Sequence, residues 1–198
     1  MSEPLGPRRR HWIEYAATFA ALTVSVISLW VAIATEQANQ KMVDANDRMV
    51  AAASWPYLQL NSSNDDNGKK RITLELENAG VGPAKIQSLE VFWRGKAYGS
   101  AFQLLRDCCA PGQDLIQMGT VPVQGVVLRA GAERQFLSID LRSDNLATWK
   151  AFDQVRLSEL TYRACYCSVF DECWVRELRA GRALRVKACP KPATPYTR

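Results

Sequence analysis

An uncharged run of 21 residues, Tyr15-AATFAALTVSVISLWVAIA-Thr35, stands near the N-terminus. A helix rises 1.5 Å per residue, so this run would span roughly 30 Å, which is the thickness of the hydrocarbon core of a bilayer. Trp12 and Tyr15 lie where aromatic side chains meet the membrane interface. The run therefore predicts a transmembrane helix over residues 12–35, with the lipid bilayer as its partner.

Three basic residues, Arg8, Arg9 and Arg10, precede this run. Basic residues stay preferentially on the cytoplasmic side, so residues 1–11 are expected in the cytoplasm. The large C-terminal part is then expected on the periplasmic or extracellular side of the inner (plasma) membrane. A cleaved signal peptide is the alternative, because Ala32-Ile33-Ala34 has the small-x-small form of a cleavage site. The apolar run is longer than a usual signal core, which favours an uncleaved signal-anchor.

Residues 36–55 are polar and contain no Gly or Pro before Pro56, which predicts a helical stalk that ends there. Small or apolar residues recur at alternating spacings of four and three from the apolar run into the stalk. This seam comprises Ala17, Ala21, Val24, Ser28, Val31, Thr35, Ala38, Met42, Ala45, Met49 and Ala52. In lipid it would let helices approach closely, and in water it would form a short coiled coil. A homo-oligomer is one expectation; an alanine-rich helix with an accidental seam, or one that packs on its own domain, is the other.

The segment from residue 56 to 180 has short alternating runs separated by turn residues, a pattern typical of antiparallel β structure. Strands are expected at 57–60, 72–76 and 86–93, with a hairpin of 126–128 and 134–141 and a second hairpin of 155–167 and 173–178. The two glycines of the turn at 78–84 are expected to supply positive φ. Helical insertions are expected at 100–108 and at 144–152, the latter capped by Ser143.

Seven or so short strands favour an immunoglobulin-like sandwich, with a small barrel as the alternative. The fold class expected is thus a transmembrane helix and stalk followed by a mainly antiparallel all-β domain with two short helical insertions. Residues 181–198 are expected to be a basic, solvated tail. Contact of that tail with anionic lipid is the alternative, and no basic-aromatic module points to nucleic acid.

Several short motifs carry a resemblance. They are the Ala-Ala-Ser-Trp-Pro-Tyr junction at 52–57, the Asn78-x-Gly80-x-Gly82-Pro83-Ala84 turn and an aromatic hairpin of Tyr166, Phe170 and Trp174. With the small-residue helix and polar stalk, the chain resembles uncharacterised bacterial single-pass membrane proteins that have a small β-rich C-terminal domain. The resemblance implies a fold and no activity, and the cysteines depart from its pattern.

All six cysteines follow the apolar run: Cys108, Cys109, Cys165, Cys167, Cys173 and Cys189. An even number in an oxidising compartment predicts up to three disulfides. Cys165 and Cys167 face the same side of one strand and should not bond each other. Cys167 and Cys173 straddle a turn and form the candidate disulfide. Cys165 and Cys189 are then left for the adjacent pair Cys108 and Cys109, although the connectivity stays open.

No residue pattern for catalysis, cofactor or metal binding stands out. The one histidine, His11, precedes the apolar run, which removes His-based catalysis from the domain. Zinc is a rival use of the thiols, but Cys-x₂-Cys spacing is absent. The turn at 78–84 is no phosphate loop, and Asp65-Asp66 lacks EF-hand spacing.

The function expected is that of a membrane-anchored, non-enzymatic binding or scaffolding protein of the bacterial envelope, with a protein partner that the sequence does not identify. One alternative is an accessory or regulatory subunit of a membrane assembly that acts through the transmembrane-stalk helix. The other is a carboxylate- or thiol-dependent enzyme.

Overall fold

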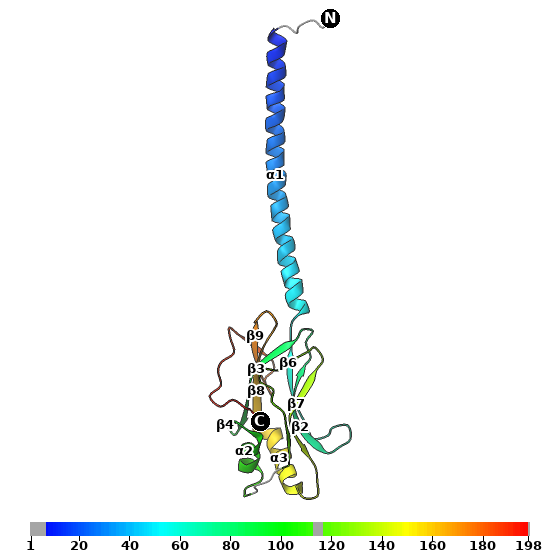
Figure 1. Cartoon of the computed structure of the whole chain (residues 1–198), viewed down its shortest axis with the longest axis vertical. Coiled ribbons are helices and arrows are strands. Elements are labelled where there is room, and N and C mark those ends of the chain that lie inside the picture. The colour runs from blue at the N-terminus through cyan, green and yellow to red at the C-terminus, as the bar shows by residue number, and fades with distance from the viewer. Residues whose placement is uncertain (1–6, 113–116, 198) are drawn as a thin grey trace. The chain divides into compact units, whose positions relative to one another are not determined.

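The structure is a computed structural model that describes residues 7–112 and 117–197. The chain divides into two units, Met1–Val50 and Ala51–Arg198. The described part of the first unit is helical. The second contains two antiparallel sheets and two further helices (Figure 1).

The first unit is built on one helix, α1 (Pro7–Ala53), which runs without interruption through the apolar run and the polar stalk. Pro7 suits the first helical position because the amide hydrogen that it lacks has no partner there. The helix ends in a tight turn, in which the Ser54 amide donates to the Ala51 carbonyl oxygen at 3.3 Å, just before Pro56. From His11 to Ala53 every side chain is exposed, and this segment is long and apolar enough to cross a membrane. The predicted helix and stalk are therefore one element.

The smaller sheet has the order β1-β2-β7-β5. Its strands are β1 (Leu58–Ser63), β2 (Arg71–Asn78), β7 (Glu133–Asp140) and β5 (Gly119–Thr120). Ile72, Leu74 and Leu76 of β2 are fully buried, as the predicted alternation requires, but Thr73 between the first two is also buried. A bulge interrupts the β2–β7 ladder between Leu74 and Glu75.

The larger sheet has the order β10-β9-β8-β3-β4, with β6 also paired to β3. Its strands are β3 (Ala84–Trp93), β4 (Lys96–Tyr98), β6 (Val127–Leu128), β8 (Leu160–Cys167), β9 (Cys173–Glu177) and β10 (Leu184–Val186). The helices are α2 (Ala101–Cys108), where Ser100 accepts a capping hydrogen bond from the Gln103 amide, and α3 (Leu146–Ser158).

The core lies between the two sheets, and aromatic side chains join them. The ring of Phe136 on β7 meets that of Tyr162 on β8 edge to face, with centroids 5.1 Å apart. The Tyr162 hydroxyl donates to the Asn61 carbonyl oxygen on β1. It also lies 3.3 Å from the carbonyl oxygen of Glu75, which is the register partner of Asn61 on β2. Burial raises the pKa of Tyr162, so the hydroxyl stays protonated and available as a donor.

Three local predictions are wrong, and in the first of them a distant part of the chain supplies the partner strands. Residues 126–128 and 134–141 do not form a hairpin: β6 pairs with β3 and β7 with β2. Residues 155–158 belong to α3 rather than to a strand. Ser143 is not the helix cap; Asn145 takes that position, and its side chain bonds the Arg142 amide and the Asp140 carbonyl oxygen instead.

The predicted solvated tail, residues 181–198, is mostly exposed over its described residues, as expected, but it is also attached to the β domain. Strand β10 pairs with β9, and Tyr196 is 2% exposed, with its ring 5.5 Å from that of Phe136. The Tyr196 amide donates to the Leu89 carbonyl oxygen at 2.9 Å. Arg185 in this segment pairs with Glu172, and Arg179 just before it donates to the carbonyl oxygens of Arg156 and Leu157 near the end of α3.

Like charges face one another on the smaller sheet. Glu77 on β2 is the register partner of Glu133 on β7, and Glu75 lies two residues away. Burial raises the pKa of Glu75, and the charges of Glu133 and Glu77 raise it further. A raised carboxyl pKa means that the folded state binds the proton more tightly than the unfolded state does. Protonation of Glu75 therefore adds to the free energy of unfolding at low pH. That contribution is lost as the pH rises through the folded-state pKa.

Glu75→Gln is therefore expected to raise the thermal unfolding midpoint at about pH 7 and to have little effect at about pH 3.5. Glu159 is the matched control of opposite sign, because hydrogen bonds from Arg94 and then Trp93 lower its pKa. Glu159→Gln should lower the midpoint at neutral pH. Thermal unfolding followed by circular dichroism at both pH values measures the effects; no gain from Glu75→Gln at neutral pH would contradict the assignment.

Candidate functional site: one end of the β domain

The turn after β2 and the turn after β8 lie at the same end of the domain. Lys85, at the start of β3, is the register partner of both Val127 on β6 and Cys167 at the end of β8. Helices α2 and α3 lie toward the opposite end (Figure 1). The β2–β3 turn, β6 and the β8–β9 turn therefore make up one end surface.

This end surface carries four exposed apolar side chains, which we call the end patch. They are Val81 in the β2–β3 turn, Val127 on β6, and Val169 and Phe170 in the β8–β9 turn, exposed by 64, 59, 47 and 55%. Turns are usually polar, so the apolar residues Val81, Val169 and Phe170 are unusual at these positions. Sequence reasoning missed the end patch, although valine and phenylalanine inside predicted turns were a usable signal.

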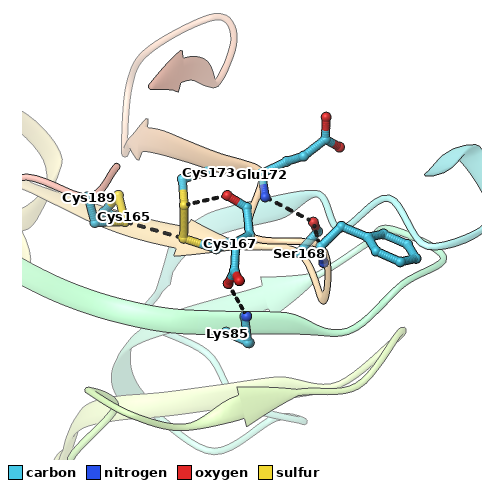
Figure 2. Close-up of a disulfide and its surroundings, with 9 residues drawn as sticks. Lys85, Cys165, Cys167, Ser168, Glu172, Cys173 and Cys189 are labelled. Atoms are coloured by element: carbon cyan, nitrogen blue, oxygen red, sulfur yellow. Dashed lines mark hydrogen bonds and ion pairs between the residues drawn. A yellow bond between two sulfur atoms is a disulfide. The ribbon is translucent and has the colours of Figure 1, made fainter. Parts of the chain in front are cut away.

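The tip of the β8–β9 hairpin is held in one conformation by Ser168, which is 2% exposed. Its hydroxyl accepts hydrogen bonds from the Phe170 and Glu172 amides, and its own amide donates to the Glu172 carbonyl oxygen (Figure 2). Asp171 takes a φ of 60° and forms an ion pair with Lys85 on β3. Val169 and Phe170 are therefore presented on a turn whose backbone groups are already bonded.

Two disulfides lie directly below this tip (Figure 2). Cys167 and Cys173 are register partners across the hairpin, with Cα atoms 4.0 Å apart, and are bonded. Cys165 on β8 is bonded to Cys189, with Cα atoms 5.7 Å apart. The Sγ atoms of Cys167 and Cys189 lie 3.7 Å from each other, so the two bonds are in contact.

The expected link from Cys165 and Cys189 to the adjacent cysteines is absent, because Cys108 and Cys109 are bonded to each other. They lie at the end of α2, beyond the Trp93 end of β3, whereas Cys165 and Cys167 are near the other end of that strand. Strand β10 brings the chain back beside β9 and so places Cys189 over β8.

Below the tip, the aromatic pair of the hairpin is also in contact. Tyr166 and Trp174 are register partners, and their rings stack with centroids 5.7 Å apart. Burial raises the pKa of Tyr166, so its hydroxyl stays neutral. The pair is part of the hairpin's packing and offers no titrating group.

Asn78 ties the end of the domain to the segment that follows α1. Its side chain is fully buried and makes four hydrogen bonds with main-chain groups. The amide nitrogen donates to the carbonyl oxygens of Gly82 and Leu128, and the amide oxygen accepts from the amides of Tyr57 and Gly80. All four hydrogen-bonding positions of the carboxamide are used.

The glycines of this turn have a different role from the one predicted. Neither Gly80 nor Gly82 has a positive φ. A Cβ on Gly80 would lie 2.3 Å from the Tyr57 nitrogen, and one on Gly82 would lie 1.9 Å from the Ser54 carbonyl oxygen. Close approach of the entering chain, rather than a left-handed turn, requires glycine at both positions.

The other predicted residues lie on α1. The seam residues from Ala17 to Met49 are all exposed on that continuous helix, where spacings of three and four place them on one stripe. Arg8, Arg9 and Arg10 also fall within α1, whereas residues 1–6 of the predicted cytoplasmic segment lie outside the described residues. Orientation and self-association stay predictions.

Comparison with known protein families, with curated proteins and with solved structures finds no match to this chain. The arguments for function therefore come from the geometry of the end patch, the thiols and α1.

Gly82→Ala is expected to destabilise the domain by about 1–3 kcal/mol, because the added methyl group meets main-chain atoms that cannot turn away. Gly181→Ala is the matched control, since a Cβ there meets nothing within 4 Å and its φ is not positive. That variant should stay within about 0.5 kcal/mol of the parent. Denaturant unfolding of the full chain in detergent micelles measures both, and equal stabilities would refute the close-approach role.

Proposed function

We propose that the chain is a membrane-anchored, non-enzymatic binding protein of the bacterial envelope, whose β domain presents the end patch to a protein partner. The observation that carries the proposal is the combination of exposed apolar side chains with a rigid support. Four apolar side chains stand at one end, and Ser168 and the Lys85–Asp171 pair hold the most prominent turn in place. A surface that is ordered before binding loses little conformational entropy when a partner docks.

A protein is the favoured partner because apolar contacts and charged pairs occur together at this end. Phe170 and Val169 would bury apolar area, worth roughly 25 cal/mol per Å². Lys85–Asp171 and Arg185–Glu172 supply polar groups beside them. An apolar centre with a polar rim is the usual composition of a protein interface.

The order of the strands supports an immunoglobulin-like sandwich. In the order β1-β2-β7-β5 the smaller sheet follows the A-B-E-D order of that fold, and β9-β8-β3-β4 follows G-F-C-C′. In this correspondence the β2–β3 and β8–β9 turns are the B–C and F–G loops. Those loops belong to the binding end of immunoglobulin variable domains.

The proposed location is the inner (plasma) membrane, with the N-terminus in the cytoplasm and the β domain outside. An exposed apolar helix supports the membrane anchor. Arg8, Arg9 and Arg10 support the orientation by the positive-inside rule. Six cysteines paired as disulfides support an oxidising compartment for the domain.

Thiol labelling tests the orientation. In intact spheroplasts, a membrane-impermeant maleimide is expected to label no cysteine until a membrane-impermeant phosphine has reduced the disulfides, after which labelling should occur without lysis. The control is a cytoplasmic protein with exposed thiols, which should label only after lysis. If the cysteines of the chain label only after lysis, and without any reductant, the domain lies in the cytoplasm.

Photo-crosslinking tests the binding end. A photoreactive amino acid at Phe170 is expected to form adducts with a protein of constant mass in intact cells, and Val169→Asp in the same chain should reduce the yield at least about tenfold, because a buried unpaired charge is costly. Leu157 is the matched control: it is 63% exposed but lies at the end of α3, away from the end patch.

Two results would count against the end patch as the binding surface. One is a yield of adducts at Leu157 equal to that at Phe170. The other is the absence of adducts at Phe170 in cells that fold the chain normally. An adduct of exactly twice the mass of the chain would identify the partner as a second copy.

A further inference from the structure

Four cysteine sulfurs from three separate segments meet below the β8–β9 tip. The Sγ atoms of Cys167, Cys173 and Cys189 all lie within 4.8 Å of one another, and Cys165 is bonded to Cys189 (Figure 2). We call these four residues the thiol cluster. The third disulfide, between Cys108 and Cys109, is not part of it.

We propose that the thiol cluster, when its two disulfides are reduced, is a binding site for one zinc ion. Cys167, Cys173 and Cys189 would be ligands, with Cys165 as the fourth. Zinc takes four thiolates at about 2.3 Å in a tetrahedron, which places sulfurs about 3.8 Å apart. The distance of 3.7 Å between the Sγ atoms of Cys167 and Cys189, which are not bonded to each other, already fits that edge. The proposal is independent of the partner-binding function above.

The positions of the cysteines do not depend on the disulfides alone. Cys167 and Cys173 face each other because the β8–β9 ladder pairs them, and Val186 on β10 pairs with Cys173 in turn. Beyond Cys189, the buried Tyr196 and its main-chain bond to Leu89 fix the chain again. The segment that carries Cys189 is therefore held at both ends by the fold, so reduction leaves the sulfurs close together.

The surroundings suit a thiolate site. Cys165, Cys167 and Cys173 are 3, 4 and 5% exposed, so a bound ion would be shielded from water. Four thiolates and one zinc ion carry a net charge of two negative units, which needs positive neighbours. Lys187 and Lys191 flank Cys189 in the sequence, and Lys85, which also pairs with Asp171, is the register partner of Cys167.

The chemistry makes the two states exclusive. Each disulfide takes two electrons and two protons from a dithiol, which is itself oxidised to a disulfide, and yields two thiols. Zinc then binds as the four thiols release their protons. Because the oxidised cluster offers no thiolate, the cluster holds either zinc or two disulfides.

Cobalt(II) is the spectroscopic probe for this site, and the sample is the full chain in detergent micelles, reduced by a phosphine under argon. We expect one equivalent of cobalt to give thiolate-to-cobalt charge-transfer and tetrahedral d–d absorption, and zinc to displace it. The oxidised chain provides the baseline. Near-ultraviolet circular dichroism reports whether the domain is folded in each sample.

The decisive variants are two double replacements that each remove one disulfide. Cys167→Ser with Cys173→Ser is expected to abolish the thiolate absorption, whereas Cys108→Ser with Cys109→Ser should leave it unchanged. The proposal is overturned if the reduced chain shows no thiolate absorption, whether folded or unfolded by reduction. It is also overturned if the replacement of Cys108 and Cys109 removes the absorption equally.

Discussion

The side-chain amide of Asn78 is the point on which the arrangement of the domain depends. It is fully buried and bonds four main-chain groups from the entering chain, the β2–β3 turn and β6. A carboxamide is required because two donors and two acceptor positions must be matched at once. A side chain that lacks either half would leave buried main-chain groups unsatisfied, at about 1–3 kcal/mol each. Close approach at Gly80 and Gly82 makes this bonding geometrically possible.

How far the sequence predicts this fold depends on whether the information is local. The apolar helix, the alternation of Ile72, Leu74 and Leu76, and the turn between Cys167 and Cys173 are local, and the structure agrees with each. The pairing of β6 with β3 depends on residues far apart in the sequence. Alternation of apolar and polar residues indicates that a segment is a strand, but it does not indicate which strand will be its neighbour. The predicted start of a strand at residue 155 is wrong, because short apolar runs occur in buried helices as well as in buried strands.

The candidate site shows the same division. The hairpin that carries Val169 and Phe170 follows from spacing, but its rigidity depends on Ser168 and on an ion pair that reaches across to Lys85. The predicted partner of Cys189 was wrong, because the sequence does not show that β10 returns beside β9. The end patch and the thiol cluster both have members in the segment 167–173, so the redox state of the cysteines and the shape of the tip are properties of one hairpin.

Tyr196 has a consequence for the order in which the protein is made. Its ring fills the space beside Phe136 between the sheets, and Thr197 donates to the Gly99 carbonyl oxygen from the next position. A ribosome delivers these residues only after all the strands of both sheets. The core therefore stays unsealed until residues 196 and 197 have been made, and a nascent chain halted before them lacks the ring that packs beside Phe136.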